Sequence, residues 1–430
     1  MTSSPFEPFV KKVTSKVKSK EAHEMIKKEL THHLQELSHS YQKIELTKEE
    51  ADEKAVQAMG NPFSIGTNLN RLHKPKMDWI VLALFVAIVA VSFLQLLGLE
   101  YEVYVGRHAL FYSIAILALV GFLFFDYRKL KNLWMFFYGA GFTLLVSTYL
   151  FGNMMNGATR WLTIGGFTLD VTLTLFLFFL AWAGLLDRIN VWNSVNKQVL
   201  LIVLFWAPIF VYLQLPHVML SIIYFFSVGI MFAVSRVHKK IAINIVGFTL
   251  GMGFIFIGFM IFTGRGSYFF ARMSSFLYPE RDPYGAGYMY FLVKDLLSQA
   301  GWFGNGFIND GNRQALPGAH TDMAFPNVVY SLGWVFGIFL CIMLLIFIWR
   351  ISSNAFKTKD LFGRLIVIGG ATFIAVPTLW NILMGLGFAP IMEVSLPFIS
   401  YGGSMLLFYN AVLGLILNVY RRKDLVEPTI

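Results

Sequence analysis

The sequence predicts an all-α, polytopic membrane protein of about ten transmembrane helices with a large extracellular loop, preceded by a small cytoplasmic helical domain. Composition is the first observation behind this prediction, because 56% of the 430 residues are hydrophobic and only 14% are charged. The second is a series of apolar runs long enough to cross a bilayer, which begins near residue 79. The third is charge placement, since the basic residues collect in the first segment and in alternate short loops.

Residues 1–75 differ in composition from the rest and form the predicted cytoplasmic domain, with residues 76–430 as the transmembrane domain. An apolar stripe at three- and four-residue spacing predicts an amphipathic helix on Ile26, Leu30, Leu34, Leu37 and Tyr41. Residues 47–50 have the sequence of a capping box that opens a further helix, which Gly60 and Pro62 are expected to end. From residue 20 to residue 62 this segment resembles the helical permease prefix domain of some bacterial membrane proteins.

The apolar runs give the expected transmembrane spans in chain order. They cover residues 79–99, 109–125, 133–151, 167–186, 199–213, 217–234, 241–262, 325–349, 361–386 and 396–420.

Charge asymmetry orients these spans by the positive-inside rule. One set of loops, together with the C-terminal tail, holds most of the basic residues: Arg128, Lys129, Lys131, Arg188, Lys197, Arg236, Lys239, Lys240, Arg350, Lys357, Lys359, Arg421, Arg422 and Lys423. The short loops on the other side hold only Arg107 and Arg160. Both termini are therefore expected in the cytoplasm, and the long segment 263–324 with Asp322 is expected outside.

The same observations disfavour other classes of protein. A formal net charge of +10 could suggest nucleic acid, but its distribution follows the predicted topology, so we expect no nucleic-acid partner. A single cysteine, Cys341, excludes an intramolecular disulfide and a cysteine-based zinc site. Since no His, Asp and Glu residues have ligand spacing, no metal site is predicted, although a requirement for a divalent cation stays open.

Asp322 stands out because it directly precedes an apolar run, where a carboxylate that enters hydrocarbon costs several kcal/mol. Arg160, in the outer loop 156–161, could bind a diphosphate through its guanidinium, or it could be an interfacial Arg–Trp anchor. The glycines of residues 301–306 favour a re-entrant loop over a nucleotide site. Residues 395–404 combine proline, glycines and serines, which predicts an irregular helix start that lines a cavity or a surface where small residues pack.

Three motifs occur in order: NGA-R-W at 156–161, LPGAHTD at 316–322 and LPFISYGGS at 396–404. With about ten spans and a large outer loop, they resemble the SEDS family (shape, elongation, division and sporulation) of FtsW, RodA and SpoVE over roughly residues 77–420. The resemblance implies a peptidoglycan glycosyltransferase of the cell membrane. Such an enzyme polymerises lipid II, an undecaprenyl diphosphate-linked substrate, on the outer membrane face, beside a class B penicillin-binding protein that acts as transpeptidase.

The resemblance also implies roles for single residues. Asp322 falls on the family's catalytic aspartate, and a carboxylate in a partly desolvated cavity can act as a general base because its pKa rises toward neutrality. The residues expected to bind the substrate are Arg160, Arg272, His320, Ser400 and Ser404. The α-linked donor and β-linked product imply one displacement with inversion, without a nucleotide or other cofactor.

Several positions depart from the family pattern. Phe176 stands where a lysine is usual, Gln314 replaces a glutamate, and residues 329–333, including Tyr330, replace a Gly-Glu-Glu-Leu-Gly run. The expected outer cavity has thus lost a cation and carboxylates and gained Asp170 and Glu393. Two alternatives to an active polymerase stay open: a flippase or transporter for a polyprenyl-linked precursor, and a catalytically impaired scaffold that regulates a transpeptidase. The sequence does not separate elongation, division and sporulation as the process served.

Overall fold

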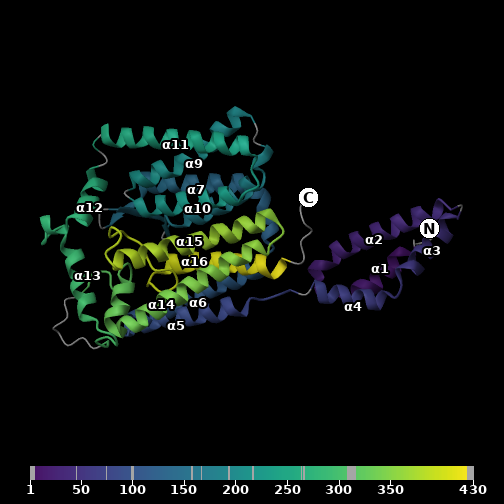
Figure 1. Ribbon diagram of the computed structural model, residues 1–430, viewed down its shortest axis with the longest axis horizontal. Helices are drawn as coiled ribbons and strands as arrows, with labels where there is room; N and C mark the ends of the chain where they lie inside the picture. The colour runs from purple at the N-terminus through teal and green to yellow at the C-terminus, as the bar shows by residue number, and fades with distance from the viewer. Residues whose placement is uncertain are drawn as a thin grey trace. The chain divides into compact units, whose positions relative to one another are not determined.

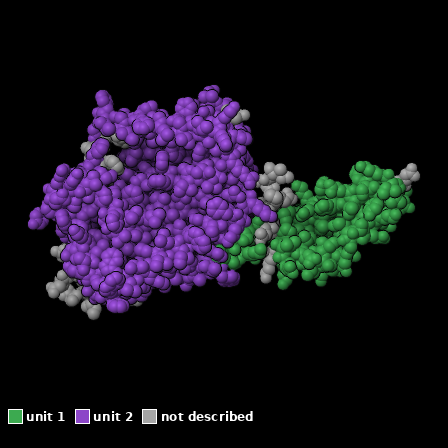
Figure 2. All heavy atoms as spheres, viewed as in Figure 1, with its two compact units in different colours: residues 1–78, 420–430 green, residues 79–419 purple. Residues whose placement is uncertain are grey.

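The computed structural model describes residues 5–44, 46–73, 75–97, 101–155, 158–165, 167–191, 194–215, 217–262, 264, 267–307 and 316–423. The chain divides into two compact units (Figures 1 and 2). The first contains Met1–Asp78 with Tyr420–Ile430, and the second contains Trp79–Val419.

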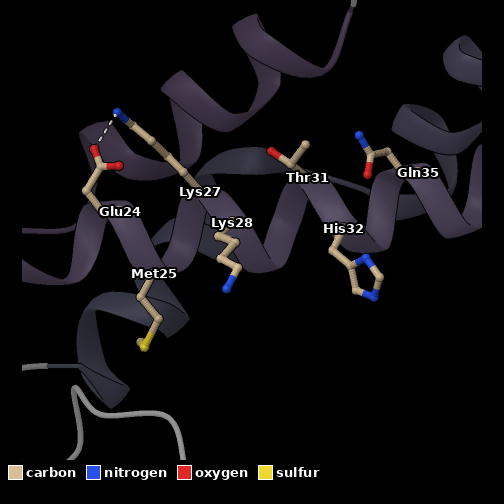
Figure 3. A pocket seen from close by; sticks show the side chains of 7 residues that line it. All are labelled: Glu24, Met25, Lys27, Lys28, Thr31, His32 and Gln35. Atoms are coloured by element: carbon tan, nitrogen blue, oxygen red, sulfur yellow. Dashed lines mark hydrogen bonds and ion pairs between the residues drawn. The ribbon is translucent and has the colours of Figure 1, made fainter.

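The described part of the first unit contains the helices α1 (Phe6–Ser15), α2 (Lys20–Gln42), α3 (Lys48–Met59) and α4 (Pro62–Leu72). The predicted stripe of α2 faces their common core, where Ile26, Leu30 and Leu34 are buried and Leu37 and Tyr41 are partly buried. The prediction of an amphipathic helix is therefore confirmed. The opposite side of α2 is mostly polar, and Figure 3 shows the side chains of this side that line a surface pocket: Glu24, Met25, Lys27, Lys28, Thr31, His32 and Gln35.

The predicted capping box is present at the start of α3, where Thr47 Oγ1 accepts from Glu50 N and Glu50 Oε2 accepts from Thr47 N at 3.1 Å. Gly60 ends α3 with a φ of 80°. The predicted end of this helix at Gly60, with Pro62 just beyond it, is therefore confirmed, and Pro62 also begins the next helix. Proline occupies the first turn of α4, where its missing N–H has no helical partner to lose, and Asn61 Oδ1 caps that helix by accepting from Phe63 N at 2.9 Å.

The second unit is a bundle of apolar helices, as predicted. Seven helices of the described chain are long and apolar enough to cross a membrane, and three shorter apolar helices complete ten candidates. Their bounds are α5 Trp79–Leu94, α6 Tyr101–Phe124, α7 Trp134–Phe151, α8 Leu173–Asp187, α9 Val195–Gln214, α10 Val218–Val234, α11 Lys239–Phe262, α14 Ala324–Phe356, α15 Leu361–Gly385 and α16 Gly403–Arg422. The centre of the bundle is α15, which packs against α8, α10 and α14.

The predicted fourth span starts too early in the sequence. Residues from 167 onward first form β3 (Phe167–Asp170), which pairs antiparallel with β2 (Ala158–Ile164), and β2 pairs with β1 (Asn153–Met155). The β-branched and aromatic residues of β2 suit such pairing, whereas the apolar character of residues 167–169 resembles that of the helix that follows. Residues 158–161 of the Arg160 motif therefore lie on strand β2 rather than in a loop, and residues 156 and 157 lie outside the described residues.

The last span also begins later than predicted, at Gly403 instead of residue 396. Residues 396–400 form turns, in which the backbone of Phe398 has a φ of 63°. Residues other than glycine rarely adopt this value. Tyr112 Oη donates to the Phe398 carbonyl, and Gln95 Nε2 donates to the Ile399 carbonyl at 2.6 Å. The predicted irregular helix start is thus confirmed, and side chains of neighbouring elements hold its backbone.

The long segment 263–324 is partly helical, with α12 (Ser267–Leu277) and α13 (Tyr288–Gln299) in its described part. Its glycine run packs backbone to backbone against a break in α14 at Gly333, whose φ is 85° and ψ 171°. Trp334 N donates to the Gly301 carbonyl at 3.0 Å, and Asn305 N donates to the Tyr330 carbonyl at 3.0 Å. The glycine run therefore supports the first turns of α14, directly after Asp322.

We expect Gly333→Ala to lower the free energy of unfolding by roughly 2 kcal/mol or more, because only glycine adopts this backbone region without strain. A Cβ at this position would also lie 2.3 Å from the Trp302 carbonyl oxygen. The control is Gly251→Ala in α11, where a Cβ would meet nothing within 4 Å. Thermal unfolding of the purified protein in detergent measures both, and equal midpoints for the two variants would contradict the packing argument.

Candidate active site

Asp322 lies in a tight turn just before α14. Gly318, with a φ of 70°, lets the chain turn back, and its carbonyl accepts from Thr321 N and from Met323 N, both at 2.9 Å. These bonds fix the backbone on either side of Asp322, whose side chain is partly buried. The carboxylate is thus held at the end of a membrane helix by local geometry.

Two hydrogen bonds join this turn to the segment 386–402 between α15 and α16. Ser400 Oγ donates to the Thr321 carbonyl at 2.5 Å, and Tyr401 N donates to the His320 carbonyl at 2.7 Å. Ser400 is buried and also accepts from Leu396 N at 2.7 Å, so its hydroxyl binds backbone and positions the two segments. Ser404, by contrast, is exposed on the first turn of α16. Of the two serines predicted to bind substrate, only Ser404 is exposed.

Asn381 of α15 makes the third connection, which our reading of the sequence missed. Its Nδ2 donates to the Asp322 carbonyl at 2.8 Å and to the Val394 carbonyl at 2.7 Å, and the side chain is completely buried. One carboxamide therefore fixes the backbone at Asp322 and beside Glu393. A polar residue within an apolar span is itself a signal of function, and that signal could have identified Asn381.

Arg272, on α12, contacts the segment 386–402. Its Nη1 donates to the Ile391 carbonyl at 2.6 Å, while Ile391 N donates to Tyr290 Oη at 3.0 Å. Helices α12 and α13 therefore hold the backbone two residues before Glu393. The structure gives Arg272, a predicted substrate ligand, a backbone contact that positions this segment.

Arg160 extends from β2 and pairs with Asp170 at the end of β3, with 3.0 Å between Nε and Oδ2. Asp170 is itself fixed, because its Oδ1 accepts from Thr172 N at 2.9 Å. The Arg160 side chain is 28% exposed, whereas that of Asp170 is only 6% exposed. The guanidinium uses one of its five N–H donors in this bond and faces solvent in part, as an anion-binding arginine requires.

The pKa of Asp322 is set by its burial and by the charges of Glu393 and Arg160. Burial, and then the negative charge of Glu393, raise the pKa of Asp322 to about 6, while Arg160 acts in the opposite direction. His217, just before α10, interacts with the same charged residues. Burial and Arg160 lower the pKa of its imidazole, and Glu393 and Asp170 partly offset this decrease. The structure thus brings Asp322, Arg160 and Glu393 together from three separate segments.

His320, adjacent to this turn, packs among aromatic rings. Its imidazole lies 4.9 Å from the Tyr104 ring and 5.7 Å from the Tyr401 ring, and burial lowers its pKa. The ring is therefore neutral at pH 7, where it could donate or accept one hydrogen bond to a sugar but offers no positive charge.

Two of the positions that depart from the family pattern, Phe176 and Tyr330, make structural contacts. Phe176 packs edge-on against Phe122 and Phe408, at 5.5 and 6.2 Å between ring centroids, so an aromatic cluster replaces the usual lysine. Tyr330 supplies the carbonyl that binds the glycine run. Gln314 lies outside the described residues. Within the described chain no group of three or more His, Cys, Asp or Glu side chains could hold a metal ion.

This arrangement suits proton transfer beside an anion. A carboxylate with a raised pKa accepts a proton more readily than an ordinary aspartate, and the partly exposed guanidinium can offset negative charge that develops nearby. Both groups are supported by backbone bonds from neighbouring segments, which limits their reorganisation during a reaction.

Comparison with known proteins agrees with the fold and the motifs. Residues 75–425 match the family model FTSW_RODA_SPOVE, described as cell cycle protein. A relative named probable peptidoglycan glycosyltransferase FtsW, from Pseudoalteromonas translucida, is 33% identical over 68% of this chain and 73% of its own. A protein of the same name from Trichlorobacter lovleyi is 28% identical over 62% of this chain and 70% of its own.

Solved structures share the fold. A chain of a peptidoglycan synthase complex matches with a TM-score of 0.67 and 24% identity, covering 81% of this chain and 98% of that chain. The Rod shape determining protein RodA of Thermus thermophilus matches with a TM-score of 0.58 and 22% identity, covering 81% of this chain and 97% of its own. The protein is a multi-pass, helical membrane protein, and it belongs to the FtsW, RodA and SpoVE family of cell cycle proteins.

Proposed function

We propose that the protein is a peptidoglycan glycosyltransferase that polymerises lipid II, with Asp322 as general base. Relatives named as peptidoglycan glycosyltransferases support the reaction class. The single observation that carries the assignment of the site is the Asp322 carboxylate, whose pKa of about 6 is set by burial and by Glu393 and whose neighbour is the Arg160 guanidinium. The same observation favours catalysis over the transporter and scaffold alternatives, since those functions need no tuned base at the end of a helix.

In the proposed reaction, Asp322 takes the proton from the acceptor sugar hydroxyl as its oxygen attacks the anomeric carbon of the donor. The bond from this carbon to the diphosphate breaks at the same time, and undecaprenyl diphosphate leaves with the electron pair. Arg160 offsets the charge on the departing diphosphate. One displacement of this kind inverts the configuration from α to β and uses no nucleotide or other cofactor.

We further propose that this site faces the outside of the cell and that both termini are cytoplasmic. The distribution of basic residues between alternate loops supports this orientation. A transpeptidase of the class B penicillin-binding type is the proposed partner, because the similar fold of a chain from a peptidoglycan synthase complex is compatible with such an assembly.

Polymerisation of labelled lipid II by the purified full-length protein tests the assignment. We expect Asp322→Asn to lower the rate by roughly 10²- to 10⁴-fold, the usual contribution of a general base. Asp295→Asn, on α13, is the matched control, since Asp295 contacts its helix neighbour Gln299 and should leave the rate unchanged. If Asp322→Asn polymerises as fast as wild type, Asp322 is not the base. If wild type moves lipid II across liposomes but does not polymerise it, the flippase alternative holds.

The pH dependence of kcat/KM, which reports the pKa values of the free enzyme, tests the electrostatic setting of Asp322. Asp322 must be deprotonated to act as a base, so activity should fall on the acid side with a midpoint at about 6. Glu393→Gln removes a negative charge that raises this pKa, and the acid limb should therefore move to lower pH. Glu280→Gln, on the outer segment, is the control. If Glu393→Gln leaves the acid limb of the pH profile unchanged, the proposed effect of Glu393 on the pKa of Asp322 is refuted.

Asn381→Leu tests the positioning of Asp322. We expect kcat to fall by about 10²-fold, because a reacting group displaced by 1 Å can cost that much. The acid limb should also move toward the ordinary aspartate pKa as water reaches Asp322. Asn418→Leu is the matched control, since Asn418 is an equally buried asparagine that donates to two carbonyls, with Phe122 O at 2.6 Å. If both variants shift the limb alike, the effect is general destabilisation and not positioning.

A further inference from the structure

An apolar cavity of about 450 Å³ lies among α8, α9, α10 and α11. It sits at the far end of α8 from the active site: α8 follows the Arg160–Asp170 hairpin at Leu173 and reaches the cavity at Trp182 and Leu186. The lining residues of α11 and most of those of α9 lie in the first half of their helix, and most of those of α10 lie in the second half of theirs. The cavity therefore belongs to the end of the bundle that carries the basic loops.

The lining of this cavity is almost free of polar atoms. Only Trp182 and Thr249 among its residues have a polar side-chain atom, and Trp182 Nε1 donates to Tyr224 Oη at 2.7 Å. A Cβ added to Gly229 would meet nothing within 4 Å, which indicates open space beside α10. An apolar cavity of this kind disfavours water, and its volume falls within the range of roughly 300–1,000 Å³ typical of ligand pockets.

The cavity borders the surrounding lipid through α11. This helix packs chiefly on α9 and lies at the edge of the bundle in Figure 1. Only 6% of the most apolar stretch of α11 is buried inside the protein, compared with 78% of the corresponding stretch of α15. A hydrocarbon chain from the bilayer could therefore reach the cavity along α11.

A group of exposed basic residues surrounds the same end of these helices: Arg188, Lys197, Arg236, Lys239 and Lys240. None of them forms an ion pair with a carboxylate in the part of the chain that the structure describes. The nearby Asp187 instead pairs with Lys131 at 2.8 Å. Positive charge at the membrane surface attracts the headgroups of anionic lipids.

We propose that the cavity binds one acyl chain of an anionic phospholipid whose phosphate is held by Lys239 and Lys240. These lysines begin α11, about 9 Å along its axis from the cavity residues Ile245 and Val246, so a headgroup at the lysines lies over the end of the cavity. The apolar lining takes the chain, and the two charges select the headgroup. A zwitterionic phospholipid satisfies the first requirement only.

Native mass spectrometry of the full-length protein, purified in detergent with equal phosphatidylglycerol and phosphatidylcholine, measures this selection. We expect one retained phosphatidylglycerol per chain in preference to phosphatidylcholine. Gly229→Phe fills the cavity and should abolish retention, whereas Gly251→Phe, on the lipid-facing side of α11, should retain the lipid. Both glycines offer open space to a new Cβ, so the pair is matched.

The charge is tested separately by surface changes that leave the cavity intact. Lys239→Ala with Lys240→Ala should lower the preference for phosphatidylglycerol on the order of tenfold, because each lysine contributes to anionic-lipid binding. Lys357→Ala with Lys359→Ala removes two exposed lysines that do not border the cavity and should have no effect. Equal retention of the two lipids by wild type, unchanged retention by Gly229→Phe, or an equal effect of both lysine pairs would overturn the proposal.

Discussion

The two hydrogen bonds of the Asn381 carboxamide are the constraint on which the candidate active site depends. A single buried group binds the carbonyl of Asp322 and the carbonyl of Val394, which follows Glu393. Because α15 is the most deeply buried of the long helices, its position is set by the core of the bundle. The core therefore determines where the turn at Asp322 meets the segment 386–402. This fixed contact places the carboxylate of Asp322 near that of Glu393.

Electrostatics follows from this placement. An aspartate alone at a helix end would keep an ordinary pKa, but burial and the charge of Glu393 together raise that of Asp322 to about 6. Arg160 approaches from a third segment, the hairpin before α8, and is oriented by Asp170. A base and a cation thus coexist without neutralising each other, because Arg160 has its own carboxylate partner.

The spans were predictable from the sequence because a bilayer requires long apolar helices and leaves charges at their ends. The same logic identified Asp322 and Arg160 as unusual charges. The hairpin was not predictable, since residues 167–169 resemble the apolar helix that follows them. Nor was the role of Asn381, because its partners lie 59 and 13 residues away and come together only in the folded chain.

The most direct measurement of this account is the protonation of Asp322 itself, followed by infrared difference spectroscopy of the full-length protein across pH. The carboxyl band that disappears in Asp322→Asn reports this residue alone. Our account requires that band to titrate at about 6. Titration at the ordinary aspartate value of about 4 would contradict it, because Asp322 would then be neither desolvated nor coupled to Glu393.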